Sequence, residues 1–179
     1  MEELIRREYP YRGRILNLRL DRVRLPDGRE TTREVAEHRG AVAIVAVDAQ
    51  GRVILVRQYR HAVERDLLEI PAGTLEPDEP PEQTAPRELK EETGYSAQRW
   101  EPLGRFYPSP GVLSEEMHLY LARDLVEGMS EAMEDENIEV EKVPLPDALE
   151  MVARGEIVDA KSIVGLLLAQ KILNTMATP

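Results

Sequence analysis

The chain begins with stretches in which apolar and polar residues alternate, the pattern of half-buried β-strands. Residues 14–20 alternate loosely, and the turn signal Pro26-Asp27-Gly28-Arg29 separates them from a second run at residues 30–38. This order predicts an antiparallel hairpin. Residues 41–47 are all small or β-branched and apolar, and such a run predicts a buried strand.

Further along the chain, strand-like runs and helical spacing follow one another. Strands are predicted at residues 53–58, 67–70, 100–105, 117–122 and 138–143. Amphipathic helices are predicted at residues 146–154 and 162–176. Another helix is predicted to end at Gly94, with Ala85, Leu89 and Thr93 on one face. Residues 124–137 are acidic and poor in large apolar side chains, so we expect an exposed loop there.

These elements predict an α/β fold, because strands are mixed with helices that come before and after them. We expect an α/β/α sandwich with a mixed sheet and a small N-terminal antiparallel β appendage. The chain has 179 residues, enough for one good core. We place the appendage at residues 1–39 and the main domain at residues 40–179.

Charge and composition exclude several classes of partner. A net charge of −11 leaves no basic surface for coating a nucleic acid. A small phosphate compound stays possible, because Mg²⁺ and a few arginines can hold it. No apolar run is long enough to cross a bilayer, so we expect no membrane partner. The sequence has no cysteine, which excludes thiolate metal sites and fits a reducing cytoplasm.

The strongest chemical signal is a group of acidic residues at helical spacing. Glu88, Glu91 and Glu92 face the same way on a helix, since they lie three and four positions apart. Their mutual repulsion requires a positive neighbour. Arg87 is one candidate, and a divalent cation is another, because Mg²⁺ prefers carboxylate, water and phosphate oxygens. The alternative is an acidic helix face that only contacts solvent.

Pro86 interrupts the same stretch. A proline in a helix interior costs about 3 kcal/mol, because it removes a backbone donor and its ring crowds the preceding turn. A helix that begins late, with Thr84 as its N-cap, would place Pro86 in the first turn and avoid this cost. We therefore expect the helix to begin at Thr84, with Glu88 near its entry.

The string from Gly73 to Tyr95 resembles the Nudix box, G-x5-E-x7-R-E-U-x-E-E-x-G-U, at every defined position. The resemblance implies a loop–helix–loop that binds Mg²⁺, with Mn²⁺ as a substitute. It also implies hydrolysis of a nucleoside diphosphate that is linked to another group.

Roles for individual residues follow from this resemblance. The carboxylates of Glu88 and Glu92 and the main-chain carbonyl of Ala72 would be metal ligands, and Glu91 would be a ligand or a near neighbour of the metal. Arg87 would orient the glutamates. Glu79 would have a more distant electrostatic or structural part.

The flanking residues resemble the ADP-ribose pyrophosphatases of that family. Pro110 falls fifteen residues after Tyr95, where those enzymes carry a diagnostic proline, and the segments at residues 11–16 and 32–35 also resemble them. GDP-mannose hydrolases share several of these motifs. The resemblance implies hydrolysis of ADP-ribose to AMP and ribose 5-phosphate. Another nucleotide sugar, such as GDP-mannose, or an idle module that senses ADP-ribose are the alternatives.

The same resemblance implies a homodimer whose N-terminal strands cross to the partner. Arg33, Glu34 and Ile15 would then contact the partner's ADP-ribose, and Arg60 would hold the diphosphate. The remaining residues of the pocket would be Glu69, Ser109, Gly111 and Glu115. From the residues alone, Arg33 and Arg60 are equally consistent with strand-edge charges, and Ile15 with core packing.

The catalytic base is left open between two residues. Glu136 lies in the acidic loop and resembles a loop glutamate that acts as the base in several relatives, although Glu131, Glu134 and Asp135 compete for that alignment. Glu91 is the alternative base. The chain's histidines, His38, His61 and His118, are widely scattered, and we expect structural roles for them.

Overall fold

The computed structural model describes residues 1–129 and 138–177 of the chain. Their elements, in chain order, are β1 (Glu3–Arg12), β2 (Leu16–Arg24), β3 (Glu30–His38), β4 (Ala41–Val47), β5 (Arg52–Arg60), the 3-10 helix η1 (His61–Val63), β6 (Arg65–Glu69), β7 (Ala72–Thr74), α1 (Pro81–Thr93), β8 (Tyr95–Phe106), β9 (Met117–Glu127), β10 (Glu139–Pro144), α2 (Leu145–Ala153) and α3 (Ala160–Ala177). Among these described residues, none of the helices has both the length and the apolar character needed to cross a membrane.

The chain divides into two compact units. The first, called here the N-terminal unit, consists of Met1–Gly40 and Phe106–Glu116. The second, called the main unit, consists of Ala41–Arg105 and the residues from Met117 onward. The segment Phe106–Glu116 thus groups with the N-terminal strands although it lies far from them in the sequence.

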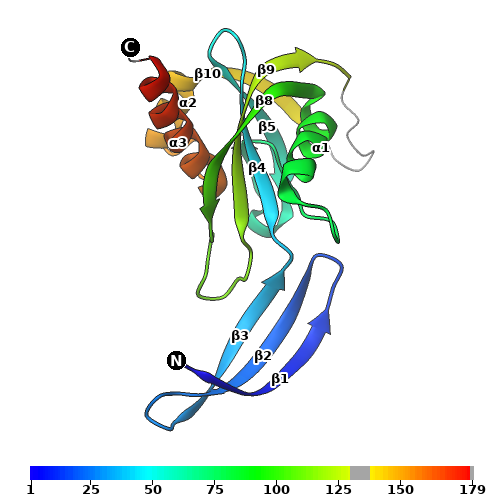
Figure 1. The fold of residues 1–179 in the computed structure, drawn as a ribbon, viewed down its shortest axis with the longest axis vertical. Coiled ribbons are helices and arrows are strands. Elements are labelled where there is room, and N and C mark those ends of the chain that lie inside the picture. The colour runs from blue at the N-terminus through cyan, green and yellow to red at the C-terminus, as the bar shows by residue number, and fades with distance from the viewer. Residues whose placement is uncertain (130–137, 178–179) are drawn as a thin grey trace. The chain divides into compact units, whose positions relative to one another are not determined.

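The main unit is built on a mixed sheet with helices on both faces (Figure 1). Its strand order is β10-β5-β4-β9-β8, with β6 paired to β5 and β7 paired to β4. Strand β4 is parallel to β9 and antiparallel to β5 and β7. Helix α1 covers one face, and α2 and α3 cover the other. The predicted α/β/α sandwich with a mixed sheet is therefore confirmed.

Strand β4 is buried on both faces, which explains its unbroken apolar sequence. Val42 and Ile44 join Leu89 of α1 in one buried cluster. Val45 points the other way, because successive strand side chains alternate between faces. There it meets α3 so closely that a Cβ on Gly165 would lie 2.9 Å from Val45 Cγ2. Each fully buried Val or Ile contributes about 1.5–3 kcal/mol, so this strand anchors the elements that carry the site.

The N-terminal unit is an antiparallel sheet of order β1-β2-β3. The predicted hairpin of β2 and β3 is present, and its turn is closed by Gly28, whose φ of 85° suits glycine. The Gly28 amide donates to the carbonyl of Leu25 at 2.9 Å. Residues 106–116 join this unit through a hydrogen bond of 2.7 Å from the amide of Ala36 to the carbonyl of Val112.

Several strands extend beyond the residues that the sequence predicted. Strand β8 begins at Tyr95, and β9 continues to Glu127, so residues 124–127 belong to a strand rather than to the expected acidic loop. Strands β1 and β7 were not predicted. Their pairing rests on the backbone of neighbouring strands, which the apolar pattern of the strand itself does not reveal.

Helix α1 begins at Pro81, so the prediction that it begins at Thr84 is wrong. Pro80 is the N-cap in an extended conformation, and Pro81 suits the first helical position, where a helical φ is needed and an N–H is not. Pro86 lies inside the helix on an exposed position. The carbonyl it leaves without a helical donor belongs to Glu82, which is also exposed, so solvent reduces the cost.

Candidate functional site

A strand, a loop and a helix carry the candidate site. Pairing of β7 with β4 fixes Ala72 and Gly73 within the sheet. The loop then leads into α1, which ends at Gly94, as the sequence predicted. Gly94 has a φ of 75°, the left-handed conformation that glycine adopts without strain. Its amide donates to the carbonyl of Lys90 at 2.8 Å, which closes the helix end.

Two glutamates of α1 pack directly against β7. The carboxyl group of Glu88 occupies the space that any side chain at Gly73 would need. Oε2 of Glu92 accepts a hydrogen bond of 3.0 Å from the amide of Ala72, and Glu92 is only 7% exposed. The helix therefore presents these carboxylates to the strand residues that precede the loop, which is where the sequence predicted a metal site.

Arg87 contacts Glu79 of the preceding loop and two glutamates of the helix, Glu88 and Glu91. Its Nε and Nη2 donate to Glu79 at 3.1 and 2.9 Å, and Nη1 lies 2.9 Å from Glu91 and 2.8 Å from Glu88. Thr84 also donates to Glu79, at 2.9 Å. The hydrogen bond to Glu79, followed by the charges of Glu88 and Glu91, raises the pKa of Arg87. Arg87, one of the two candidate counter-charges, thus offsets part of the repulsion among the acids.

The oxygen atoms gathered here suit a hard divalent cation. Within residues 1–129 and 138–177, no three Asp, Glu or His side chains already form a group that could hold an ion. Such a cage is not required, because Mg²⁺ uses one or two carboxylates and completes its shell with water and substrate phosphate. Glu88 and Glu92, both set against the Ala72–Gly73 strand, provide that donor set.

Arg60, the last residue of β5, forms an ion pair with Glu69, the last residue of β6, in which only the Glu69 side chain is fully buried. Arg60 donates from Nε and Nη2 to the two carboxylate oxygens of Glu69, at 3.0 and 2.6 Å. Lys161 Nζ contacts Glu69 Oε2 at 2.5 Å. Burial by itself raises the pKa of Glu69, but the Arg60 hydrogen bonds and the Lys161 charge outweigh it, so this pKa lies below its ordinary value.

Sequence reasoning did not identify Lys161. A usable signal existed, because Lys161 lies in the first turn of a helix, where the positive end of the helix dipole disfavours a cation. A lysine at that position points to a nearby carboxylate.

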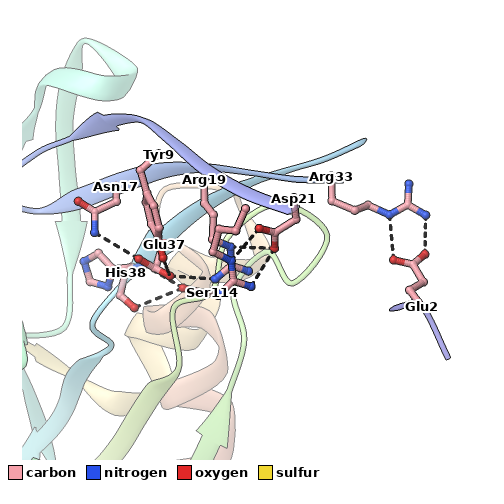
Figure 2. A network of polar contacts seen from close by, with 10 residues as sticks. Glu2, Tyr9, Asn17, Arg19, Asp21, Arg33, Glu37, His38 and Ser114 are labelled. Carbon is pink, nitrogen blue, oxygen red and sulfur yellow. Dashed lines mark hydrogen bonds and ion pairs between the residues drawn. The ribbon is translucent and has the colours of Figure 1, made fainter. Parts of the chain in front are cut away.

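The predicted pocket residues Ser109, Gly111 and Glu115 lie on one segment of the N-terminal unit. Amides of Val112 and Leu113 donate to the carbonyl of Ser109, at 3.1 and 2.9 Å, and form a turn. The segment is fastened to the end of β3 by Ser114, whose Oγ accepts from the amide of His38 at 2.9 Å (Figure 2).

The ring of His38 lies beside the same segment. Its Nδ1 accepts from the amide of Gly40 at 3.1 Å and lies 3.5 Å from Glu115. The ring is therefore used structurally, as the sequence predicted for His38.

The predicted partner-facing residues are all exposed on the N-terminal unit. Arg33 forms an ion pair with Glu2 at 2.6 Å (Figure 2). Glu34 follows it on β3 and is exposed. Ile15 is 59% exposed, so the core-packing interpretation of Ile15 is wrong. It borders a hollow whose other lining residues are Gly13, Arg14, Leu16, Asn17, Glu37, His38 and Arg39.

A polar network stabilises the sheet of this unit (Figure 2). Asp21, only 6% exposed, accepts two hydrogen bonds from Arg7, at 2.8 and 3.0 Å. Arg19 lies between Asp21 and Glu37, at 3.0 and 2.8 Å. The Arg7 hydrogen bond, followed by the charge of Arg19, lowers the pKa of Asp21 against the opposing effect of burial. Glu136, the predicted loop base, lies outside the described residues.

Comparison with known proteins finds two family models that match successive parts of the chain. Residues 37–164 match the model of the NUDIX domain, and residues 2–36 match that of the nucleoside diphosphate sugar hydrolase N-terminal domain. The chain is 45% identical over 163 residues to the ADP-ribose pyrophosphatase of Bacillus subtilis (strain 168), covering 90% of this chain and 88% of that protein.

Two further similarities extend this comparison. The chain is 43% identical over 180 residues to the ADP-ribose pyrophosphatase of Mycobacterium tuberculosis, covering 99% of this chain and 87% of that protein. The crystal structure of an ADP compounds hydrolase has the same fold, with a TM-score of 0.87 and 24% identity over 99% of this chain and 97% of that one.

Proposed function

Because the chain belongs to the Nudix family, we propose that it hydrolyses the pyrophosphate bond of ADP-ribose to AMP and ribose 5-phosphate. The observation that carries this proposal is the set of Glu88 and Glu92 carboxylates packed against the Ala72–Gly73 strand, with Arg87 offsetting their charge. We choose ADP-ribose because two relatives that are named ADP-ribose pyrophosphatase match 90% and 99% of this chain.

The metal in this proposal is Mg²⁺, with Mn²⁺ as a substitute. Nudix hydrolases use a divalent cation, and here Glu88, Glu92, Glu91 and the carbonyl of Ala72 would hold it. When bound, Mg²⁺ would polarise the phosphoryl group and make water more acidic.

The side chains of the protein would carry the remaining parts of the reaction. Arg60 would bind the diphosphate through the edge of its guanidinium group that does not contact Glu69. A carboxylate would accept a proton from the attacking water, whose oxygen forms the new bond to phosphorus as the bridging P–O bond breaks. Glu136 is our first choice for this base and Glu91 the second. Arg87 would keep the glutamates oriented.

The base can be assigned by comparing Glu136→Gln with Glu91→Gln. We expect Glu136→Gln to lower kcat strongly without changing the melting temperature. If Glu91→Gln loses far more activity and Glu136→Gln loses little, the base lies on α1.

We also propose a homodimer in which Arg33, Glu34 and Ile15 of one copy contact the nucleotide bound by the other. Glu69, Ser109, Gly111 and Glu115 would line the pocket. Exposed apolar side chains on the N-terminal unit, which association of two copies could bury, support this proposal. These side chains are Leu4, Ile5, Tyr11, Ile15, Leu16 and Leu18.

A subunit-mixing experiment tests the dimer. Arg33→Ala removes the proposed contribution to the partner, and Glu92→Gln removes the subunit's own metal site. A mixed dimer contains one site with both residues intact, so mixing the two variants should restore turnover above that of either variant alone. Activity that stays at the average of the two variants would show that each copy works by itself.

The main experiment is product analysis. ADP-ribose incubated with the protein and Mg²⁺ should yield AMP and ribose 5-phosphate, and chelation of the metal should stop the reaction. Binding of ADP-ribose without turnover would instead indicate a sensing module.

The absence of cysteine, which suits a reducing compartment, leads us to place the enzyme in the cytoplasm.

A second candidate is hydrolysis of another nucleotide sugar, such as GDP-mannose. The match of residues 2–36 to a domain of nucleoside diphosphate sugar hydrolases favours this wider class. Comparison of kcat/KM for ADP-ribose and GDP-mannose separates the two, and a higher value for GDP-mannose would replace ADP-ribose as the substrate.

A further inference from the structure

A lysine is buried beside the proposed diphosphate site. The sequence motifs described above assign it no role. The side chain of Lys161 is 11% exposed. Its Nζ lies 2.5 Å from Glu69 Oε2 and 3.0 Å from Asp159 Oδ1. Asp159 also accepts a hydrogen bond of 3.0 Å from the amide of Ser162, so it caps the beginning of α3 and fixes the turn that carries Lys161.

This position is costly for a lysine. A cation in the first turn of a helix meets the positive end of the helix dipole. Burial adds a desolvation cost, and well-packed apolar residues often replace a buried ion pair without loss of stability. Folding alone therefore does not explain why a lysine stands at position 161.

Glu69 shares its single negative charge between two cations. Its side chain is 2% exposed and contacts both Arg60 and Lys161. Arg60 uses Nε and Nη2 for this contact, and its Nη1 donates to no side chain among the described residues. The Arg60 side chain is 38% exposed, whereas Lys161 is enclosed. Of the two cations, Arg60 is the one that a ligand can reach.

Arg60 also lies within the electrostatic reach of one of the proposed metal-site carboxylates, that of Glu92. The hydrogen bond to Glu69 is the main cause that raises the pKa of Arg60, and the charges of Glu69, Glu92 and Asp159 contribute. A diphosphate near Glu92 would therefore lie where the Arg60 charge is felt. With Glu69 as its only partner, Arg60 would form a neutral pair and attract the diphosphate weakly.

We propose that Lys161 is a positioning residue for the substrate diphosphate. Lys161 neutralises Glu69, so Arg60 is oriented by that carboxylate while its positive charge stays available to the diphosphate. This inference rests on the proposed hydrolysis of ADP-ribose, and it predicts an effect on substrate binding rather than on the bond-breaking step.

The test replaces Lys161 with methionine, which is unbranched and only one heavy atom shorter and removes the charge. We expect K161M to raise KM for ADP-ribose about tenfold, while kcat stays within about twofold of the original. K161R should restore most of the original KM, because it returns the charge. The matched control is Lys171→Met, an exposed lysine on the same helix, which should leave KM unchanged.

Inhibition separates a positioning role from a structural one. ADP carries the diphosphate, so its inhibition constant should rise in parallel with KM in K161M. Adenosine carries no phosphate, so its inhibition constant should not change. If K161M does not fold, K161Q is measured in its place, since it can still donate a hydrogen bond to Glu69 but has no charge.

Two results would overturn the inference. One is an unchanged KM for ADP-ribose in the folded, uncharged variant. The other is equal weakening of ADP and adenosine, which indicates general distortion of the pocket. The unsubstituted protein is measured in the same assay. If it does not hydrolyse ADP-ribose, the proposed function itself fails, which is a different outcome.

Discussion

A Cβ placed on Gly73 would lie 1.8 Å from Cδ of Glu88 and 2.2 Å from each of its carboxylate oxygens. No heavy atoms approach so closely without a bond. The backbone of Gly73 does not have a positive φ, so this glycine is required for space rather than for its conformational freedom. Gly73 and Glu88 are thus two parts of one contact.

Replacement of Gly73 by alanine should therefore displace Glu88. We expect Gly73→Ala to lower kcat by at least about 100-fold at saturating Mg²⁺, because one proposed metal ligand moves out of position. Binding of Mn²⁺, followed by electron paramagnetic resonance, should weaken in the same variant. Thr74→Ala, an exposed change in the same strand, is the control. Activity near the original value in Gly73→Ala would remove Glu88 from the metal site.

Glu92→Gln tests the second carboxylate with little disturbance. The glutamine oxygen can still accept the hydrogen bond from the Ala72 amide, so the contact with β7 should persist. The negative charge that attracts the cation is lost, and we expect kcat to fall by about 1,000-fold or more with a small change in melting temperature. Steady-state kinetics over a range of Mg²⁺ concentrations measures this. Turnover near the original value at every Mg²⁺ concentration, low ones included, would contradict a direct ligand role.

Pro86→Ala should stabilise the protein. The alanine restores an N–H that can donate to the carbonyl of Glu82 within α1, and Pro86 is exposed, so no core contact is lost. We expect the free energy of unfolding to rise by about 1–3 kcal/mol, since greater freedom of the unfolded chain offsets part of the gain. Urea denaturation measures the change. A loss of stability would mean that the proline ring makes a packing contact that matters.

Acid should destabilise the protein partly through Glu69. Its pKa is lowered in the folded chain from an ordinary value of 4.5. Stability from this group is therefore fully present above about pH 4.5 and is lost as the pH falls through the lower folded-state pKa. Glu69→Gln should cost about 3 kcal/mol at pH 7, because it leaves Arg60 and Lys161 without their carboxylate.

Urea titrations of both proteins from pH 7 to pH 3 measure this linkage. The difference between the two unfolding free energies should shrink as the pH falls. A difference that stays constant across this range would show that the charge of Glu69 does not contribute to stability.

Ser114→Ala should loosen the segment that carries the proposed pocket residues. Ser114 Oγ accepts from the amide of His38 at 2.9 Å and donates to its carbonyl at 3.3 Å. Loss of these bonds should raise KM for ADP-ribose about threefold to tenfold with a smaller effect on kcat. Ser96→Ala, exposed on β8, is the matched control. An unchanged KM would mean that the remaining backbone bonds, from the Ala36 amide to Val112 and from the Ser114 amide to Ala36, are enough to hold the segment.

The elements with a regular apolar pattern were predictable from the sequence. Strand β4 was predicted at the residues where it lies, because a strand buried on both faces needs an unbroken apolar run. The end of α1 at Gly94 was predictable for a local reason, since a left-handed residue at a helix end favours glycine. The beginning of α1 was predicted wrongly. Pro86 lies on an exposed turn of α1, where solvent can bind the carbonyl that the proline leaves without a donor, so the helix continues through it.

By itself, the sequence determined the class of fold, the order of its main elements and the spacing of the acidic residues, because these depend on neighbours a few positions away. Only the tertiary structure decided that Gly73 makes room for Glu88, that Ser114 fastens its segment to His38 and that Lys161 shares Glu69 with Arg60. Glu69 and Lys161 are 92 positions apart. Contacts over such separations depend on how sheet and helices pack, and no local pattern encodes them.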